Sequence, residues 1–436
     1  MPAFSRRSGV ALTALFALLA GISGCTAVQR EPTDSRPSVS RRATGQTPDA
    51  KPRSPRTDGS PGDILVAGRP ITGSKATGHP VAPFQRTYTD GELYSSVTGY
   101  WSMAFGKAGL DSVMADDVQA GKDVPTTIDP GMQRAAFDGL RDKRGAAFVL
   151  DAETGAILGQ VSTPSFDPGA FSGNSGADAR AWEALKDVDD GPLRNRALRE
   201  VVNPGPAIHV LVAAAALEKG LLASVDTPTN NPAVYIVPGS TTQFSGDPAH
   251  CTNATLRAAL RYSCENVFAH IASDLGADAL ASTAEEAGFN HDTMDTPVRA
   301  FESTWPRKPQ NATQLALAAG GLSDVKATPM QMAMVTALIS NGGLRVHPRI
   351  VTDTKSPMPP HRALSERTAD QLQSALGNSF SAWVPSASVS WALSATRTPA
   401  GRPVAIAVYI TSPTDATAQA SQVAQRVAVS SDPDGQ

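Results

Sequence analysis

The chain has 436 residues, of which 41% are hydrophobic and 18% charged. This length suits about two domains, and the apolar fraction allows a substantial core, which excludes an intrinsically disordered protein. With 38 Lys and Arg against 41 Asp and Glu, the net charge of −3 argues against a nucleic-acid-binding protein, which normally carries a basic surface. The 36 glycines and 34 prolines indicate linkers or many turns.

The first residues have the pattern of an export signal. Arg6 and Arg7 precede an apolar run over residues 10–22 that is too short to span a bilayer. Ile22 to Cys25 resembles the lipobox of bacterial lipoproteins, which implies a signal peptide over residues 1–24 and a lipid on Cys25. We therefore expect the chain to be lipid-anchored at the extracytoplasmic face of the cell membrane. The alternative is an ordinary signal peptide with an incidental cysteine; a twin-arginine signal fits the following residues poorly.

Residues 25–62 follow as the lipidated cysteine and a linker. This segment is rich in Pro, Ser, Thr and Arg and has almost no large aliphatic side chain, so it cannot bury enough surface to offset the entropy of ordering it. The expected elements then begin with a strand at 64–66, glycine-rich turns through Gly78, and helices at 111–120 and 130–141.

The remaining elements alternate between strands and helices. Residues 146–150 and 156–161 read as the two strands of a hairpin around the turn at 151–155. Long apolar helices are expected at 206–222 and 328–339, then strands at 389–395 and 404–411 and an amphipathic helix ending near Val429. This order predicts an α+β fold.

Several motifs in this order resemble the transpeptidase domain of class B penicillin-binding proteins. They are found at 125–136, 145–151, 162–168, 194–197, 204–205, 328–333 and 341–343. Residues 68–73 and 96–100 look like the N-terminal region of the actinobacterial members. The resemblance implies a β-lactamase-like fold, an antiparallel sheet flanked by helices with a helical subdomain. A small N-terminal module would occupy residues 63–125 and the transpeptidase-like domain residues 126–430.

The resemblance also implies three catalytic motifs: Ser-x-x-Lys, Ser-x-Asn and Lys-Thr/Ser-Gly. The first supplies a serine nucleophile and the lysine that activates it, directly after Pro204-Gly205. Here Pro206 stands at the serine position and His209 at the lysine position. Proline fits the first turn of a helix, where its missing N–H leaves no hydrogen bond unmade. The substitution spares the fold and deletes the chemistry.

The other two motifs are also damaged. The second reads Ser263-Cys264-Glu265, with Glu in place of Asn. The third is expected shortly before Ser390, but residues 377–389 contain no lysine, and neither Lys-Thr-Gly nor Lys-Ser-Gly occurs in the chain. Two chance matches lie outside the expected context: Ser323 with Lys326, which do not open an apolar helix, and Ser172 with Asn174 in a glycine-rich loop.

Export to an oxidising compartment predicts a disulfide between Cys251 and Cys264. A loop this short would contribute about 3 kcal/mol of stability in the chain-entropy description. Two buried free thiols are the alternative.

The leading hypothesis is a catalytically inactive penicillin-binding-protein homologue that binds peptidoglycan or proteins of wall synthesis. One alternative is a hydrolase rebuilt from His209, Ser263 and Glu265 as base, nucleophile and acid. Another is a non-covalent sensor of muropeptides or β-lactams. No cofactor or metal is expected, because the seven histidines form no His-Glu-x-x-His pattern and no phosphate-binding loop occurs. Three basic residues remain, and they either line the substrate groove that the resemblance implies or are solvated surface charges: Arg257, Arg261 and Lys326.

Overall fold

The computed structural model describes residues 56, 58–291, 296–352 and 358–430. The compact unit that begins at Pro48 contains all of them. The expected signal peptide, Cys25 and nearly all of the expected linker lie outside the described residues. Among those that are described, no helix has the length and apolar character needed to cross a membrane.

The N-terminal module consists of short strands around small helices. Strand β1 (Ile64–Val66) pairs antiparallel with β2 (Arg69–Pro70) and parallel with β7 (Val124–Pro125). Two further hairpins are β3 (Thr72–Ala76) with β4 (Phe84–Tyr88), and β5 (Tyr100–Ser102) with β6 (Gly106–Ala108). Helix α1 (Gly91–Thr98) lies between these hairpins in the chain. Glycine-rich turns were expected through Gly78, so β2 and β3 were not predicted.

The helix expected at 111–120 is wrong as a single element. The structure has two short helices, α2 (Leu110–Val113) and α3 (Ala115–Gln119), separated by Met114. Asp111 is fully buried in an ion pair of 2.9 Å with Arg86, and its carboxylate also accepts a hydrogen bond from Tyr88. The ion pair ties α2 to β4. We attribute the interruption of the expected helix to this tertiary contact, which the helical periodicity of the sequence does not reveal.

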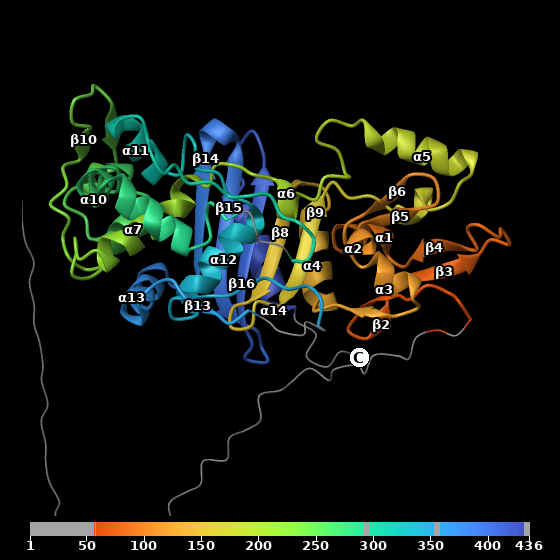
Figure 1. The fold of residues 1–436 in the computed structure, drawn as a ribbon. Helices are drawn as coiled ribbons and strands as arrows, with labels where there is room; N and C mark the ends of the chain where they lie inside the picture. Colours follow the sequence, from red (N-terminus) through yellow and green to blue (C-terminus); the bar gives the residue numbers. More distant parts are fainter. Residues whose placement is uncertain (1–55, 57, 292–295, 353–357, 431–436) are drawn as a thin grey trace, which may run out of the picture. The chain divides into compact units, whose positions relative to one another are not determined.

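The larger part of the chain is built on a five-stranded antiparallel sheet (Figure 1). Its strand order is β14-β15-β16-β8-β9. The strands are β8 (Arg144–Asp151), β9 (Ile157–Thr163), β14 (Ser379–Val384), β15 (Val389–Arg397) and β16 (Pro403–Thr411). β8 and β9 form the expected hairpin, and β15 and β16 are the two expected late strands. Strand β16 is central and almost wholly buried, which explains its continuous apolar run.

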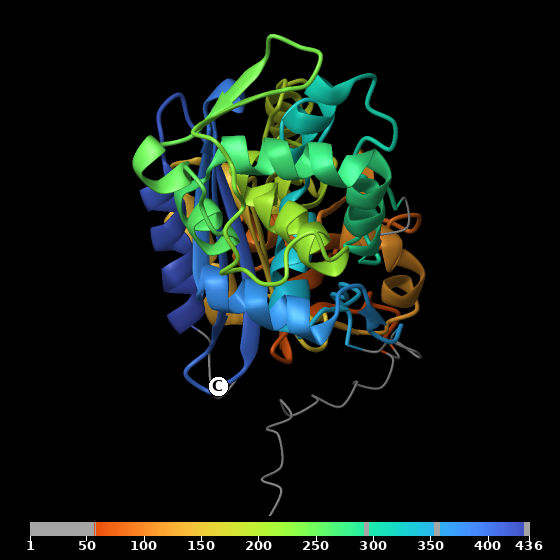
Figure 2. The same ribbon diagram turned by 90° about the vertical axis from the view of Figure 1, so that its left-hand side faces the viewer.

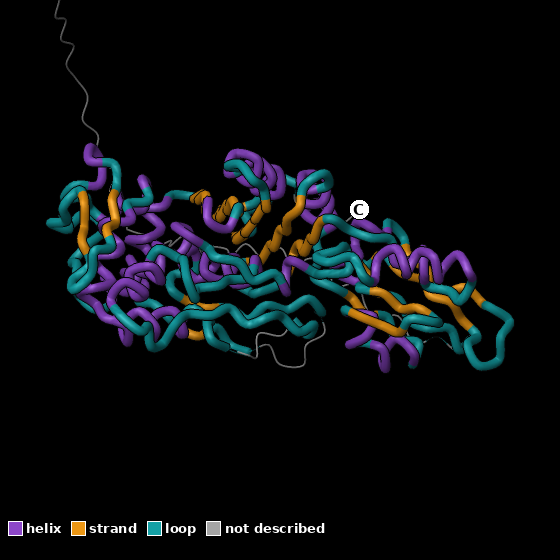
Figure 3. The backbone as a smooth tube through the Cα atoms, turned by 90° about the horizontal axis from the view of Figure 1, so that it is seen from above, coloured by secondary structure: helices purple, strands orange, loops and turns teal. Residues whose placement is uncertain are grey.

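Helices cover both faces of this sheet (Figures 2 and 3). α4 (Pro130–Leu140) and α14 (Thr417–Val429) pack against each other on one face, and α12 (Pro329–Ser340) lies on the other. All three were expected. α4 and α12 begin with a capping side chain followed by proline, Asp129-Pro130 and Thr328-Pro329. This is the sequence signal for a helix start.

A group of helices adjoins the β14 end of the sheet and contains the region of interest. It is built from α7 (His209–Glu218), α8 (Pro248–Cys251), α9 (Leu256–Tyr262), α10 (Glu265–Glu286), α11 (Ala312–Ala319), α13 (Glu366–Leu376) and the hairpin of β10 (Val234–Ile236) with β11 (Gln243–Ser245). α10 packs on both α7 and α11. The remaining elements are α5 (Gly176–Lys186), α6 (Arg196–Arg199), β12 (Leu344–Arg345) and β13 (His361–Arg362).

Candidate functional site

The family's nucleophile position lies in a 3-10 turn. Residues Gly205–Ile208 form this turn, and α7 follows from His209 to Glu218. The helix expected over 206–222 therefore starts later and ends four residues earlier than predicted. Pro206 is half-buried in the turn. Its ring needs no hydrogen-bond acceptor there, and it offers no nucleophilic atom.

The turn is packed closely against its neighbours. Gly205 has φ 53° and donates its N–H to Gly321 O at 3.0 Å. A Cβ atom on Gly205 would lie 2.4 Å from Cγ2 of Val384, the last residue of β14. Val384 is 1% exposed, so the edge strand ends directly on the turn. The end of β14, the strand where the third motif is expected, therefore packs an aliphatic side chain against the first-motif turn.

His209 is sealed inside the protein. Its side chain is 0% exposed, and its ring stacks on Phe268 of α10 with centroids 3.9 Å apart. Neither ring nitrogen has a hydrogen-bond partner in the described part of the chain. Burial lowers the pKa of His209 to about 3, so the imidazole is neutral near pH 7. With its pKa this low and no hydroxyl hydrogen-bonded to either nitrogen in the described residues, His209 is a poor proton acceptor and does not replace the lysine.

The second motif lies where α9 passes into α10. Ser263 follows α9 in a left-handed conformation with φ 51°, and Glu265 begins α10. Partial loss of hydration raises the pKa of the Glu265 carboxyl group. Asn266, directly after Glu265, is buried; its amide donates to the carbonyl oxygens of Pro232 at 2.7 Å and Cys251 at 3.0 Å. This amide therefore holds backbone and is not presented to a substrate.

The geometry of His209 does not support the hypothesis of a rebuilt triad of His209, Ser263 and Glu265. A triad needs hydrogen bonds from nucleophile to base and from base to acid. The histidine makes neither bond, because the stacked Phe268 ring and the apolar surroundings isolate it. The packing of α7 on α10 brings the first-motif and second-motif segments together. The His209 side chain, however, is buried against Phe268 and does not bond to the second motif.

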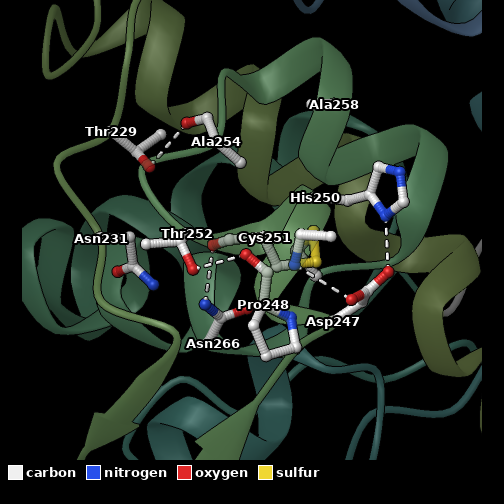
Figure 4. Close-up of a disulfide and its surroundings, with 12 residues drawn as sticks. Thr229, Asn231, Asp247, Pro248, His250, Cys251, Thr252, Ala254, Ala258 and Asn266 are labelled. Carbon is white, nitrogen blue, oxygen red and sulfur yellow. Dashed lines mark hydrogen bonds and ion pairs between the residues drawn. A yellow bond between two sulfur atoms is a disulfide. The ribbon is translucent and has the colours of Figure 1, made fainter. Parts of the chain in front are cut away.

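A disulfide fixes the second-motif segment (Figure 4). It joins Cys251 and Cys264, whose Cα atoms are 5.4 Å apart, as the sequence analysis expected. Both cysteines are fully buried. The bond ties α8 to the residue between Ser263 and Glu265, so the position of the motif is set by a covalent link as well as by packing.

The third-motif position is an edge strand, at residues for which no helix or strand was predicted. Strand β14 pairs only with β15, from Ser379 opposite Ser394 to Val384 opposite Val389. Side chains along β14 alternate between a more buried side, which includes Ala382 and Val384, and a more exposed side. Apolar residues recur at every second position of the sequence on the buried side. This period of two could have predicted the strand. It contains no lysine, so a bound carboxylate would lack the cation that family members supply here.

The two chance motif matches have structural explanations. Ser323 lies in the loop before α12, and Lys326 donates its ammonium to Asn203 Oδ1 at 2.8 Å. The Asn203 amide in turn donates to the carbonyl oxygens of Ser323 and Val325. Lys326 therefore fastens this loop beside the 205–208 turn. Ser172 accepts a hydrogen bond from Gln85 at 3.0 Å and is buried.

The two remaining basic candidates also lie outside any catalytic arrangement. Arg257 is paired with Asp226 at 2.7 Å, and Arg261 is exposed. An apolar pocket beside the turn is lined by residues of α7, α12, α13, β14 and β15, including Val210, Ile339 and Phe380. It carries no ionisable side chain and so supplies no acid or base.

Comparison with protein families identifies two regions. The penicillin binding protein transpeptidase domain matches residues 145–383, more than half of the chain, and the penicillin binding protein A dimerisation domain matches residues 61–132. This chain belongs to the penicillin-binding protein transpeptidase family. The peptidoglycan D,D-transpeptidase PbpA of Mycobacterium tuberculosis is 33% identical to it over 327 residues, which cover 68% of this chain. The match spans 66% of that relative, just under two thirds of its length.

Solved structures of the family agree with the fold. The crystal structure of penicillin-binding protein A from M. tuberculosis has a TM-score of 0.77 at 28% identity and covers 84% of this chain and 98% of its own. The penicillin G acyl-enzyme complex of the same protein has a TM-score of 0.75. The D,D-transpeptidase domain from Eggerthella lenta has a TM-score of 0.71 at 27% identity, covering 85% of this chain and 97% of its own. The expected family and fold class are confirmed.

Proposed function

We propose that this chain is a catalytically inactive family member that binds peptidoglycan or proteins of wall synthesis. The observation that carries this proposal is the 205–208 turn, in which Pro206 occupies the nucleophile position and Val384 packs against Gly205. No other group at the site takes over the nucleophile's role. The relatives named above are D,D-transpeptidases. On this proposal, the chain keeps the fold of these relatives but has other residues at the positions that carry out acyl transfer.

The loss affects every step of the family's reaction. Acyl transfer requires a nucleophile, a base that accepts its proton, and a group that binds the substrate carboxylate. Pro206 has no hydroxyl, His209 is buried with no hydrogen-bond partner among the described residues, and β14 offers no lysine. Removing the nucleophile alone from a serine hydrolase costs about a million-fold in turnover. With all three absent, a binding role is the function that fits this fold best.

The test is covalent labelling of the full chain with a fluorescent penicillin. We expect no labelled band after denaturing electrophoresis at concentrations that fully label penicillin-binding protein A of M. tuberculosis, which forms a penicillin G acyl-enzyme. The double variant Pro206→Ser with His209→Lys should also stay unlabelled, because β14 still lacks its motif. Labelling of the unmodified chain that excess unlabelled penicillin blocks would overturn the proposal.

The binding role itself is tested separately. Sedimentation of the full chain with insoluble peptidoglycan should retain it in the pellet, and cross-linking in cells should recover wall-synthesis proteins. If the chain neither sediments with peptidoglycan nor cross-links to such proteins, the binding role is refuted, even if penicillin labelling is absent.

A further inference from the structure

The hairpin of β10 and β11 presents apolar side chains to solvent. Val234 is 44% exposed and Ile236 is 55% exposed, whereas Tyr235 between them is buried. The hairpin lies at the outer end of the helical group (Figures 1 and 3). Its inner side packs on α10 and α11, and Thr313 of α11 donates a hydrogen bond of 3.1 Å to Ser240 at the hairpin tip. The hairpin is therefore fixed on the helical group, with its two apolar side chains on the outer side.

The backbone of β10 has unused hydrogen-bonding groups at the same two positions. Val237 N–H donates to Thr242 O at 3.0 Å, so these two opposite residues form a bonded pair. Bonded and non-bonded pairs alternate along an antiparallel ladder. Ile236 and Val234 therefore belong to non-bonded pairs, and their N–H and C=O groups point away from β11. Among the described residues, β10 pairs with β11 alone, so these groups form a free strand edge.

This edge lacks the features that usually protect a strand from pairing. Native proteins block exposed edges with charged side chains, proline or a bulge. No charged residue occurs between Asp226 and Asp247, and β10 contains no proline. The register of β10 with β11 is also unbroken. An uncharged apolar edge of this kind favours pairing with another uncharged strand.

We propose that β10 pairs antiparallel with β10 of a second copy of this chain. The edge is self-complementary about a twofold axis through Tyr235, because Val234 then lies opposite Ile236 of the second copy, and Ile236 opposite Val234 of that copy. Both pairs are bonded pairs, since these residues carry the outward N–H and C=O groups. The valine and isoleucine side chains of both copies share one face of the joined sheet and contact one another. An isologous contact of this kind closes as a dimer.

The contact is small, with three residues of β10 from each copy. Small interfaces give transient, concentration-dependent association. The edge is separate from residues 61–132, which match a dimerisation domain, and from the 205–208 turn on which the proposed inactivity rests. The inference goes beyond the proposed function, and either conclusion can fail alone.

Disulfide trapping tests the register of the pairing. The full-length variants Val234→Cys and Ile236→Cys, both in a Cys25→Ser background, are oxidised separately and as an equal mixture. Opposite residues of a bonded pair have Cα atoms about 5.5 Å apart, which a disulfide spans, whereas identical positions lie diagonally at about 7–8 Å, which it does not. We therefore expect about tenfold more cross-linked dimer in the mixture than in either variant alone. Equal cross-linking in all three samples, or none in the mixture, would overturn the proposal.

Sedimentation equilibrium of the full chain with Cys25→Ser measures the association without a cross-link. Ile236→Lys places a charge on the edge and should weaken self-association about tenfold or more. The matched control is Val81→Lys, which changes a valine that is 86% exposed in the N-terminal module and should leave the association unchanged. Circular dichroism checks that each variant is folded. A monomer at every concentration, or association that Ile236→Lys leaves intact, would refute the pairing of β10; the latter result identifies another interface.

Discussion

At the scale of single residues, the replacements at the first motif differ in how well the surrounding structure tolerates them. Pro206 suits the first turn of a helix and satisfies its backbone without a donor. His209 is destabilising, because its two ring nitrogens are buried without a hydrogen-bond partner in the described residues. Unpaired buried polar groups cost about 1–3 kcal/mol. The stacking on Phe268 offsets part of this cost but gives the nitrogens no partner.

His209 should make the stability of the protein depend on pH. Its pKa of about 3 in the folded state lies below the ordinary 6.5 of the unfolded chain, so the unfolded state binds more protons between these values. Stability is complete above about pH 6.5 and falls as the pH drops toward 3, by about 2 kcal/mol at pH 5. Urea unfolding of wild type and His209→Phe at pH 7.5 and 5 measures this. We expect the variant to be more stable at both values, with the larger gain at pH 5.

The control for this effect is an exposed histidine that does not touch the core. His79→Gln should show the wild-type pH dependence, because His79 is exposed. If His209→Phe and wild type lose the same stability between pH 7.5 and 5, the buried neutral imidazole is not the source of the dependence.

At the scale of elements, the sequence correctly predicted the helices and strands that have strong local signals. α4 and α12 start at a capping residue followed by proline, and β8 and β9 are joined by an obvious turn. The segments predicted poorly depend on distant partners. α2 and α3 are separated near the buried Asp111–Arg86 pair, and β14 exists as a strand because β15 pairs with it. The Cys251–Cys264 disulfide is an element-scale restraint that holds α8 to the start of α10.

Loss of this disulfide should destabilise the helical group. The two cysteines are 13 residues apart, and a loop of this length contributes about 3 kcal/mol in the chain-entropy description. We expect the double variant Cys251→Ala, Cys264→Ala to lower the free energy of urea unfolding by about that amount. Both this variant and the reference protein with which it is compared carry Cys25→Ser. Mass spectrometry without reduction should show the two cysteine peptides linked in the reference. Free, alkylatable thiols there would contradict the bond.

At the scale of the whole molecule, one continuous apolar core joins the sheet, its covering helices and the helical group. His209 belongs to the interior of this assembly, because α7 is buried along nearly its whole length. A motif position that family members use at a reactive site is therefore part of the core here. We expect that restoring one side chain will not restore a site, since Val384 and Gly321 pack against Gly205 in the turn.

We propose that the location of the whole molecule depends on Cys25, a residue outside the described part. If Cys25 carries a lipid, the wild-type chain should be found in the membrane fraction and partition into the detergent phase. Cys25→Ser should prevent lipid attachment and abolish this partitioning. Fractionation of cells with immunodetection measures both proteins. Equal distribution of wild type and variant would contradict the lipid anchor.

The sequence by itself determined the resemblance to the family, the α+β class and which side chains stand at the expected motif positions, because collinear motifs and residue identities need no coordinates. It placed Pro206 and His209 at the motif positions but left open whether His209, Ser263 and Glu265 could form a new site. Only the tertiary structure decided that question. Burial, ring stacking on Phe268 and the contact of Val384 with Gly205 arise between segments far apart in the chain.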